Sequence, residues 1–200
     1  YMRAEGSESL LVKNIDVLAT MDEHRRVLHD AWMLALDSVE GSGYIFDILG
    51  WQRSHLLEVN RSYLADLPQR LRVDGFELVH GSPCDPFIYV DTLETAREAF
   101  ACSEATWIFC GHTHLAGVYM ALEGPTGLWV RYEPFTHEEN EPMAGPKARM
   151  LVNPGSVGQP RDGVPLAGYG IWDEQKGLRS FRVPFDLEAV LSRVEAVGFP

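Results

Sequence analysis

The chain has 200 residues, 46% hydrophobic and 23% charged, which is an ordinary composition for a globular protein with a packed core. Its formal net charge of −12 argues against a nucleic-acid backbone as the main partner, yet allows a small phosphoester bound at a metal ion. No apolar run approaches the roughly 20 residues needed to span a bilayer, and the polar first residues show no signal peptide. We therefore expect no membrane association.

The predicted elements begin with a helix-like piece near Leu10 and a short β-like run, Ile15–Met21. Asp22-Glu23-His24 follows this run, and residues 25–36 are rich in helix-forming residues. A second helical region, residues 52–67, is ended by a proline.

The middle of the chain predicts two strands around a helix. A turn at Asp74-Gly75 precedes a strand over residues 76–80. A helix over residues 92–102 follows, with Thr92 as its cap, and a strand over residues 107–110 leads into Gly111.

The remainder is dominated by short strands between turn residues, at 118–122, 127–132, 150–152, 169–172 and 178–183. Residues 137–147 are polar and predict an exposed loop, and residues 186–197 predict a closing amphipathic helix. Helices alternating with strands, followed by a run of strands, predict a layered α/β fold. No repeat or linker divides the chain, so we expect one domain over residues 1–200.

Three cysteines, Cys84, Cys102 and Cys110, are an odd number with no paired short spacing. This pattern predicts reduced thiols in an intracellular protein, not a disulfide framework. The expected location is the cytoplasm.

Histidines stand at three predicted strand exits, at His24, at His80, and at His112 with His114. Open α/β sheets bind ligands beyond the carboxyl ends of their strands. In extended backbone, residues i and i+2 share a face, and Gly111 supplies the freedom to turn before the His-Thr-His run. A single histidine of this kind is as readily an ordinary polar residue, but the set favours a metal site.

The loop from Asn153 to Gly163 leaves a predicted strand through a Pro-Gly turn. Two interpretations remain open. Asn153 can simply bond its own backbone, as in many turns. Alternatively, the loop is a rigid wall beside the metals, with Arg161 available to a phosphate.

As a set, three motifs resemble the calcineurin-like metallophosphoesterases, closest to their small bacterial and archaeal phosphodiesterases. They are Leu78-Val79-His80-Gly81-Ser82-Pro83, Cys110-Gly111-His112-Thr113-His114 and Asn153-Pro154-Gly155-Ser156-Val157-Gly158. The resemblance is clearest from about Trp51 to the end of the chain.

The resemblance implies a two-sheet α/β sandwich with two divalent metals that activate a hydroxide for phosphoester hydrolysis. It assigns His80 and His112 to one metal and His114 to the other. Manganese, iron, zinc or nickel would suit this mixed set of nitrogen and oxygen donors. The implied partner is a small phosphoester substrate.

The carboxylates of such a centre come from Asp-x-His, Gly-Asp and Gly-Asn-His motifs in the family, and none is intact here. In the preferred register, Asp22-Glu23-His24 stands for Gly-Asn-His, with Glu23 as a ligand and His24 assisting the leaving group. A second register takes Asp22-x-His24 as the first motif and Asp47 as the Gly-Asp carboxylate. A third places Asn-His-Asp at Leu28-His29-Asp30. The first register implies that the two earliest motifs are missing or degenerate.

Three hypotheses therefore stand: a metal-dependent phosphoesterase, an inactive descendant acting as a binding or scaffolding module, and a single-metal imidazole site with no phosphoester role. Metal content and phosphodiester hydrolysis separate the first two. A His112→Ala variant that loses metal but keeps phosphate-analogue binding would favour the third.

Overall fold

The computed structural model describes residues 9–12, 17–19, 27–29, 50–51, 54–73, 75–141, 147–173 and 176–196. Contacts divide the chain into two compact units. The larger comprises residues 1–14 and 68–184, and the smaller comprises residues 15–67 and 185–200. Within the described residues, no helix is long and apolar enough to cross a membrane.

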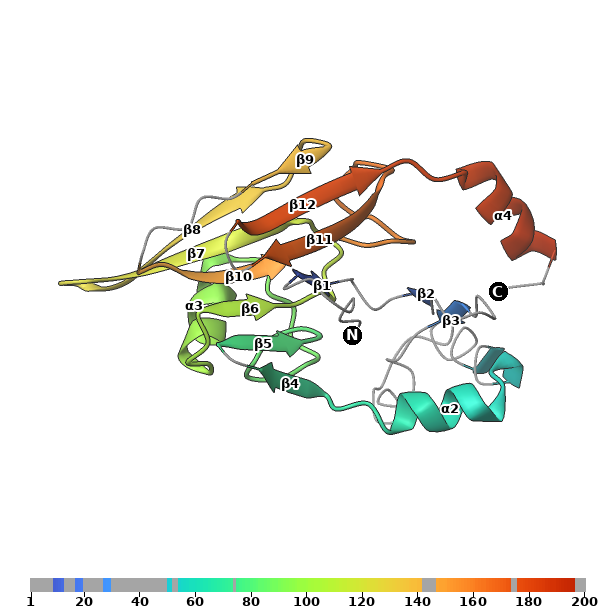
Figure 1. Ribbon diagram of the computed structural model, residues 1–200, viewed down its shortest axis with the longest axis horizontal. Helices are drawn as coiled ribbons and strands as arrows, with labels where there is room; N and C mark the ends of the chain where they lie inside the picture. Colours follow the sequence, from blue (N-terminus) through green and yellow to red (C-terminus); the bar gives the residue numbers. More distant parts are fainter. Residues whose placement is uncertain are drawn as a thin grey trace. The chain divides into compact units, whose positions relative to one another are not determined.

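Among its described residues, the larger unit contains two sheets and one helix (Figure 1). One sheet has the strand order β4-β5-β6-β10-β7-β8, and the other has the order β1-β11-β12-β9. The elements are β1 (Ser9–Val12), β4 (Arg70–Val73), β5 (Phe76–Val79), α3 (Leu93–Ala101), β6 (Trp107–Phe109), β7 (Gly117–Gly124), β8 (Gly127–Pro134), β9 (Glu139–Asn140), β10 (Arg149–Asn153), β11 (Ala167–Asp173) and β12 (Gly177–Val183).

Three parallel strands, β5, β6 and β10, lie side by side in the six-stranded sheet. Trp107 of β6 is in register with both Phe76 of β5 and Met150 of β10. The carboxyl ends of the three strands therefore meet at one edge of the sheet. The loops that follow β5 and β6 carry His80 and the His-Thr-His run, and Asn153 is the last residue of β10.

Alternation along the strands of this sheet produces two cores. On β6, Phe109 faces the first core, whereas Ile108 faces the second. The first core includes Leu178 of β12, so it joins the two sheets. The second is covered by α3, through Ala96, Ala99 and Phe100. Helix α3, the six-stranded sheet and the four-stranded sheet therefore form three successive layers. This arrangement confirms the predicted two-sheet α/β sandwich.

Helix α3 begins after its predicted cap, Thr92, and the structure shows that this cap is reciprocal with Thr95. The Thr92 hydroxyl accepts a hydrogen bond from the Thr95 backbone N–H at 3.1 Å, and the Thr95 hydroxyl accepts one from the Thr92 N–H at 3.1 Å. These two bonds satisfy two of the backbone N–H groups that the start of a helix leaves without a partner. Cys102 is the C-cap.

The smaller unit contains the strands β2 (Val17–Ala19) and β3 (Val27–His29), which pair antiparallel, and the helices α2 (Glu58–Ala65) and α4 (Leu187–Ala196). Both helices lie within predicted helical regions. Residues 20–26, which include His24, lie outside the described residues.

Two helical predictions are wrong. Val27–His29, inside the predicted helix 25–36, is a strand paired with Val17–Ala19. Leu10, predicted to begin a helical piece, lies in β1 opposite Trp172 of β11. In both places, pairing with another strand overrides the local helix preference: a nearby strand for Val27–His29 and a distant one for Leu10.

Candidate functional site

Two histidines from neighbouring strand ends lie together. The ring centroids of His80 and His112 are 4.5 Å apart, with the planes tilted by 58°. The Gly111 N–H donates to the His80 carbonyl oxygen at 2.6 Å, which joins the two loops just before His112. The parallel pairing of β5 and β6 thus brings these imidazoles together.

The backbone of the His-Thr-His loop is left-handed at both histidines, with φ of 66° at His112 and 58° at His114. The prediction of extended backbone after a turn at Gly111 is therefore wrong, because the positive φ values fall on the histidines. Such backbone costs on the order of 1–3 kcal/mol per residue and persists where surrounding contacts hold it. Strain of this kind is common at functional sites.

Backbone carbonyls orient two of the imidazoles. His112 Nε2 lies 3.1 Å from the Phe87 carbonyl oxygen, and His114 Nδ1 lies 2.8 Å from that of Gln159. Because a carbonyl can only accept, these nitrogens carry the proton in the neutral ring. The lone pair then resides on Nδ1 of His112 and on Nε2 of His114, the arrangement typical of metal-ligating histidines.

The third imidazole is held neutral. Burial lowers the pKa of His80, and the nearby His112 and His114 lower it further by charge repulsion. Neutral imidazole is the form that binds a metal.

Asn153 fastens the histidine loop to the end of β10. Its amide nitrogen donates to the Gly111 carbonyl at 2.9 Å and to the Thr113 hydroxyl at 2.8 Å. Its side-chain oxygen accepts from the Gly155 N–H at 2.9 Å. Asn153 therefore makes the local turn bond and also braces the loop, so the two sequence interpretations are compatible.

Arg161 is exposed next to the same loop. Its backbone N–H donates to the His114 carbonyl at 3.2 Å, and its guanidinium donates to the Gln159 side chain at 3.1 Å. The residue is thus anchored beside His114 through its backbone.

Sequence reasoning missed a buried ion pair behind this loop. Arg182 of β12 bonds Asp162, and its side chain is 1% exposed. Asp162 also accepts from the Ala116 N–H at 3.3 Å, close after the histidines. No local pattern links residues so far apart in the chain, so only the fold reveals the pair.

The loop after His80 was also missed as part of the site. Its Tyr89 ring lies 4.1 Å from the His112 ring between centroids, next to the Phe87 carbonyl contact. The loop folds back so that its backbone lies against Gly81. Only glycine fits there, because a Cβ would lie 2.5 Å from the Ile88 carbonyl oxygen and 2.6 Å from that of Pro86.

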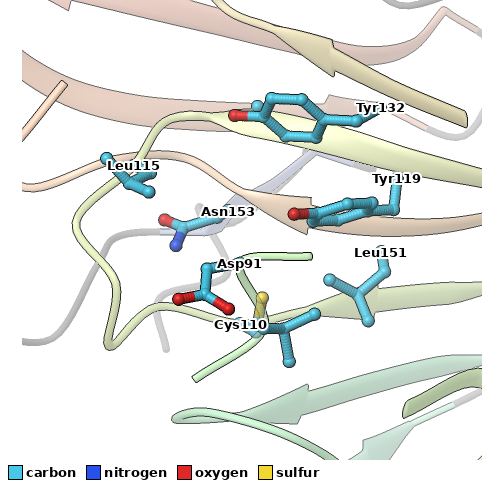
Figure 2. Close-up of a pocket in the computed structure, with 9 residues that line it drawn as sticks. Asp91, Cys110, Leu115, Tyr119, Tyr132, Leu151 and Asn153 are labelled. Atoms are coloured by element: carbon cyan, nitrogen blue, oxygen red, sulfur yellow. The ribbon is translucent and has the colours of Figure 1, made fainter. Parts of the chain in front are cut away.

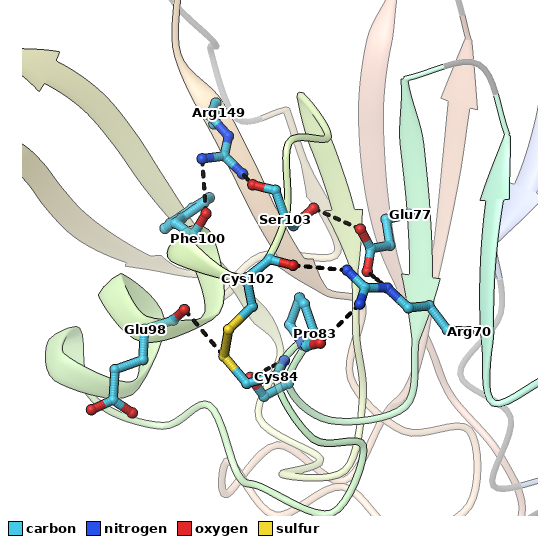
Figure 3. The surroundings of a disulfide bond; sticks show 10 residues. Arg70, Glu77, Pro83, Cys84, Glu98, Phe100, Cys102, Ser103 and Arg149 are labelled. Atoms are coloured by element: carbon cyan, nitrogen blue, oxygen red, sulfur yellow. Dashed lines mark hydrogen bonds and ion pairs between the residues drawn. A yellow bond between two sulfur atoms is a disulfide. The ribbon is translucent and has the colours of Figure 1, made fainter.

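A disulfide joins this loop to the end of α3 (Figure 3). Cys84 and Cys102 have Cα atoms 5.2 Å apart, well within disulfide range. The prediction of reduced thiols is wrong for this pair, because a separation of 18 residues gave no sequence signal. Cys110 is free, and burial raises its pKa to about 12, which leaves it an unreactive thiol.

Arg70 of β4 braces both partners of the disulfide. Its guanidinium donates to the Pro83 carbonyl at 3.1 Å and to the Cys102 carbonyl at 2.9 Å (Figure 3). It also pairs with Glu77, whose other oxygen accepts from the Ser103 hydroxyl at 2.6 Å.

These residues fit part of a metal centre. Imidazole side chains suit a divalent transition metal. Within the described residues, however, no group of three or more His, Cys, Asp and Glu side chains is arranged to hold a metal ion. His24 and its neighbours Asp22 and Glu23 lie outside that part of the chain. The described site therefore shows the imidazole portion of a donor set, without carboxylates.

Comparison with known proteins identifies the class. A model of the calcineurin-like phosphoesterase superfamily domain matches residues 16–177. The chain belongs to this superfamily, whose members generally use a dinuclear metal centre and hydrolyse phosphoesters. The match begins upstream of Trp51 and includes the segment around His24.

Among solved structures, the chain resembles a metallophosphoesterase from Sphaerobacter thermophilus, with 27% identity and a TM-score of 0.64 over 76% of this chain and 61% of that one. A hypothetical protein from Pyrococcus horikoshii shares the fold, with 18% identity and a TM-score of 0.58 over 86% and 64% of the two chains. An uncharacterized protein from Methanocaldococcus jannaschii is 25% identical, over 92% of this chain and 72% of that protein. The chain spans less than two thirds of either solved structure.

Proposed function

We propose that this chain is a metal-dependent phosphoesterase acting on a small phosphodiester or phosphomonoester. The observation that carries the proposal is the contact between His80 and His112 at neighbouring strand ends, together with the carbonyl contacts that orient the rings of His112 and His114. Two divalent cations, when bound, would lower the pKa of water and offset the charge of the phosphoryl group.

The residues of the chain would divide the work. His80 and His112 would hold one cation, and His114 would hold the other. Asn153 keeps the histidine loop in its strained shape, and the exposed Arg161 guanidinium is available to a phosphoryl oxygen. His24 would give a proton to the leaving alcohol. Manganese, iron, zinc and nickel all suit imidazole and oxygen donors.

One observation favours a second function, an inactive module that keeps the fold for binding or scaffolding. The three imidazoles carry no charge to offset two divalent cations, and the described residues place no carboxylate cluster beside them. In this alternative, the site binds metal weakly and turns nothing over.

Metal content and turnover decide between these functions. The hydrolase should bind close to two cations per chain and cleave bis(p-nitrophenyl) phosphate in added manganese. His112→Asn should lower the metal content and abolish turnover, whereas His137→Asn, in an exposed loop, should change neither. Less than one metal per chain with no turnover would establish the inactive module.

We further propose that the protein resides in the cytoplasm and that neither a membrane nor a nucleic-acid backbone is its partner. The net charge of −12 supports the last point. The Cys84–Cys102 disulfide is unusual for a reducing compartment, so thiol trapping in intact cells tests the location.

A further inference from the structure

A small cavity opens beside the histidine loop, where β6 and β10 end and β7 begins (Figure 2). Its volume is about 60 Å³, enough for roughly four to six water-sized groups. A two- or three-carbon alcohol fits such a space, whereas a nucleoside does not. The cavity therefore limits the size of any group that enters it.

The walls of the cavity come from the same loops as the candidate site. Cys110 and Leu115 bracket the segment that carries His112 and His114, and Asn153 braces that segment. None of the three histidines lines the cavity itself, so the link between the cavity and the candidate site is the loops that they share.

The polar part of the lining comprises a carboxylate, two phenols and the Asn153 amide, whose nitrogen already donates to Gly111 and Thr113. Asp91 contributes an exposed carboxylate at the rim, and Tyr119 and Tyr132 contribute ring hydroxyls, with their ring centroids 4.6 Å apart (Figure 2). Tyr132 donates to the Ala116 carbonyl oxygen at 3.3 Å. Burial raises the pKa of Tyr119, and the neighbouring Tyr132 and Asp91 raise it further, so this hydroxyl stays protonated beside the carboxylate.

This lining distinguishes the two ends of a phosphoester. An ionised carboxylate is an acceptor only, so it repels phosphoryl oxygens and attracts hydroxyl or ammonium donors. Gly117 leaves room for the Tyr132 ring in the cavity wall, because a Cβ there would lie 2.4 Å from the Tyr132 hydroxyl oxygen. The phosphoryl group thus belongs at the imidazoles and the alcohol in the cavity.

We propose that this cavity is a leaving-group subsite that selects a short alcohol bearing a hydroxyl or ammonium group, which donates to Asp91 with Tyr119 beside it. The proposal rests on the phosphoester hydrolysis proposed above, and it narrows the substrate to esters of small polar alcohols.

The test uses three phosphomonoesters of similar size: n-propyl, 2-hydroxyethyl and 2-aminoethyl phosphate. Each is titrated calorimetrically into the manganese-loaded protein and also tested as an inhibitor of bis(p-nitrophenyl) phosphate hydrolysis. We expect the hydroxyethyl and aminoethyl esters to bind about tenfold more tightly than the propyl ester, as one hydrogen bond to a charged group provides.

Variants of Asp91 and Tyr119 show which side chain is responsible for the tighter binding of the hydroxyethyl and aminoethyl esters. Asp91→Asn should remove the advantage of the aminoethyl ester, and Tyr119→Phe should reduce that of the hydroxyethyl ester. Glu104→Gln, which removes an exposed carboxylate elsewhere, should leave both intact. Equal affinities for the three esters, or a preference that survives Asp91→Asn, would overturn the subsite. The ranked binding without turnover would uphold the subsite while refuting the hydrolase.

Discussion

His80 and His112 belong to different loops, yet their imidazole rings lie 4.5 Å apart between centroids. The parallel strands β5 and β6 produce this proximity, and the Gly111–His80 hydrogen bond fixes it. The site is therefore built into the sheet edge and does not depend on one flexible loop.

Replacement of His112 should weaken metal binding. We expect His112→Asn to lower the affinity for manganese at least about tenfold, since asparagine tolerates left-handed backbone but lacks the imidazole. Titration calorimetry with His137→Asn as the matched control measures the change. Equal manganese affinities in the two variants would remove His112 from the ligand set.

Loss of the disulfide should destabilise the protein. Replacing both Cys84 and Cys102 by serine frees a loop with a sequence separation of 18, and we expect the free energy of unfolding to fall by about 2–4 kcal/mol. Urea unfolding measures this value. In the native wild-type protein, maleimide should label no thiol without reductant and two after reduction, because Cys110 is buried. Two labelled thiols before reduction would contradict the bond.

The buried pair Arg182–Asp162 should be costly to break from one side. Asp162→Asn leaves a buried guanidinium without its carboxylate, so we expect a loss of about 3–5 kcal/mol in unfolding free energy. The exposed pair Arg179–Glu139 is the control, and Glu139→Gln should cost less than about 1 kcal/mol. Similar losses of unfolding free energy in Asp162→Asn and Glu139→Gln would show that burial does not determine the contribution of these ion pairs.

Glu77 should make stability fall in acid. Burial raises the pKa of its carboxyl, but hydrogen bonds from Arg70 and Ser103 and the charges of Arg70 and Arg72 outweigh it, so the net pKa is lowered. The unfolded state then binds the proton more readily, and this stabilisation, complete above pH 4.5, is lost as the pH falls towards the folded pKa.

Urea unfolding between pH 6 and pH 3 tests this dependence, with the pH range set roughly around the unfolded glutamate pKa. Glu77→Gln should be less stable at neutral pH and should lose less stability on acidification than the wild type. Glu104→Gln, an exposed control, should follow the wild-type curve. If the unfolding free energy of Glu77→Gln fell with pH as steeply as that of the wild type, the acid sensitivity would belong to other groups.

Gly81→Ala should disturb the site through the backbone. Its Cβ would meet two carbonyl oxygens at 2.5 and 2.6 Å, so the turn that places Phe87 and Tyr89 on His112 must shift. We expect a loss of about 1–3 kcal/mol in stability together with weaker manganese binding. Gly124→Ala, where the nearest atom is 3.4 Å away, should change neither property. Unchanged manganese affinity in Gly81→Ala would show that this turn does not position His112.

Local patterns were sufficient for much of the fold. Short apolar runs next to turn residues predicted β6 and β10, and the Thr92 cap predicted the start of α3, because each depends on residues close in sequence. Val27–His29 escaped prediction because its strand exists only through pairing with β2.

The residues of the site also fall into those that local motifs predict and those that only the fold brings together. Its histidines and Asn153 stand in short motifs that a sequence displays. The Cys84–Cys102 bond and the Arg182–Asp162 pair depend on distant segments meeting, and no local pattern encodes them. The left-handed histidines were also missed, because glycine is the residue on which such backbone is usually expected.

The position of β10 constrains how the sheet is assembled. β6 and β7 are consecutive in sequence but not adjacent, and β10 pairs with both of them. Until residues 149–153 are synthesised, no strand joins β4-β5-β6 to the β7–β8 hairpin, and both pieces expose an edge that attracts other chains. A chain that stops before residue 149 should therefore aggregate. The histidine loop spans this gap, so it acquires its final shape only when β10 enters the sheet.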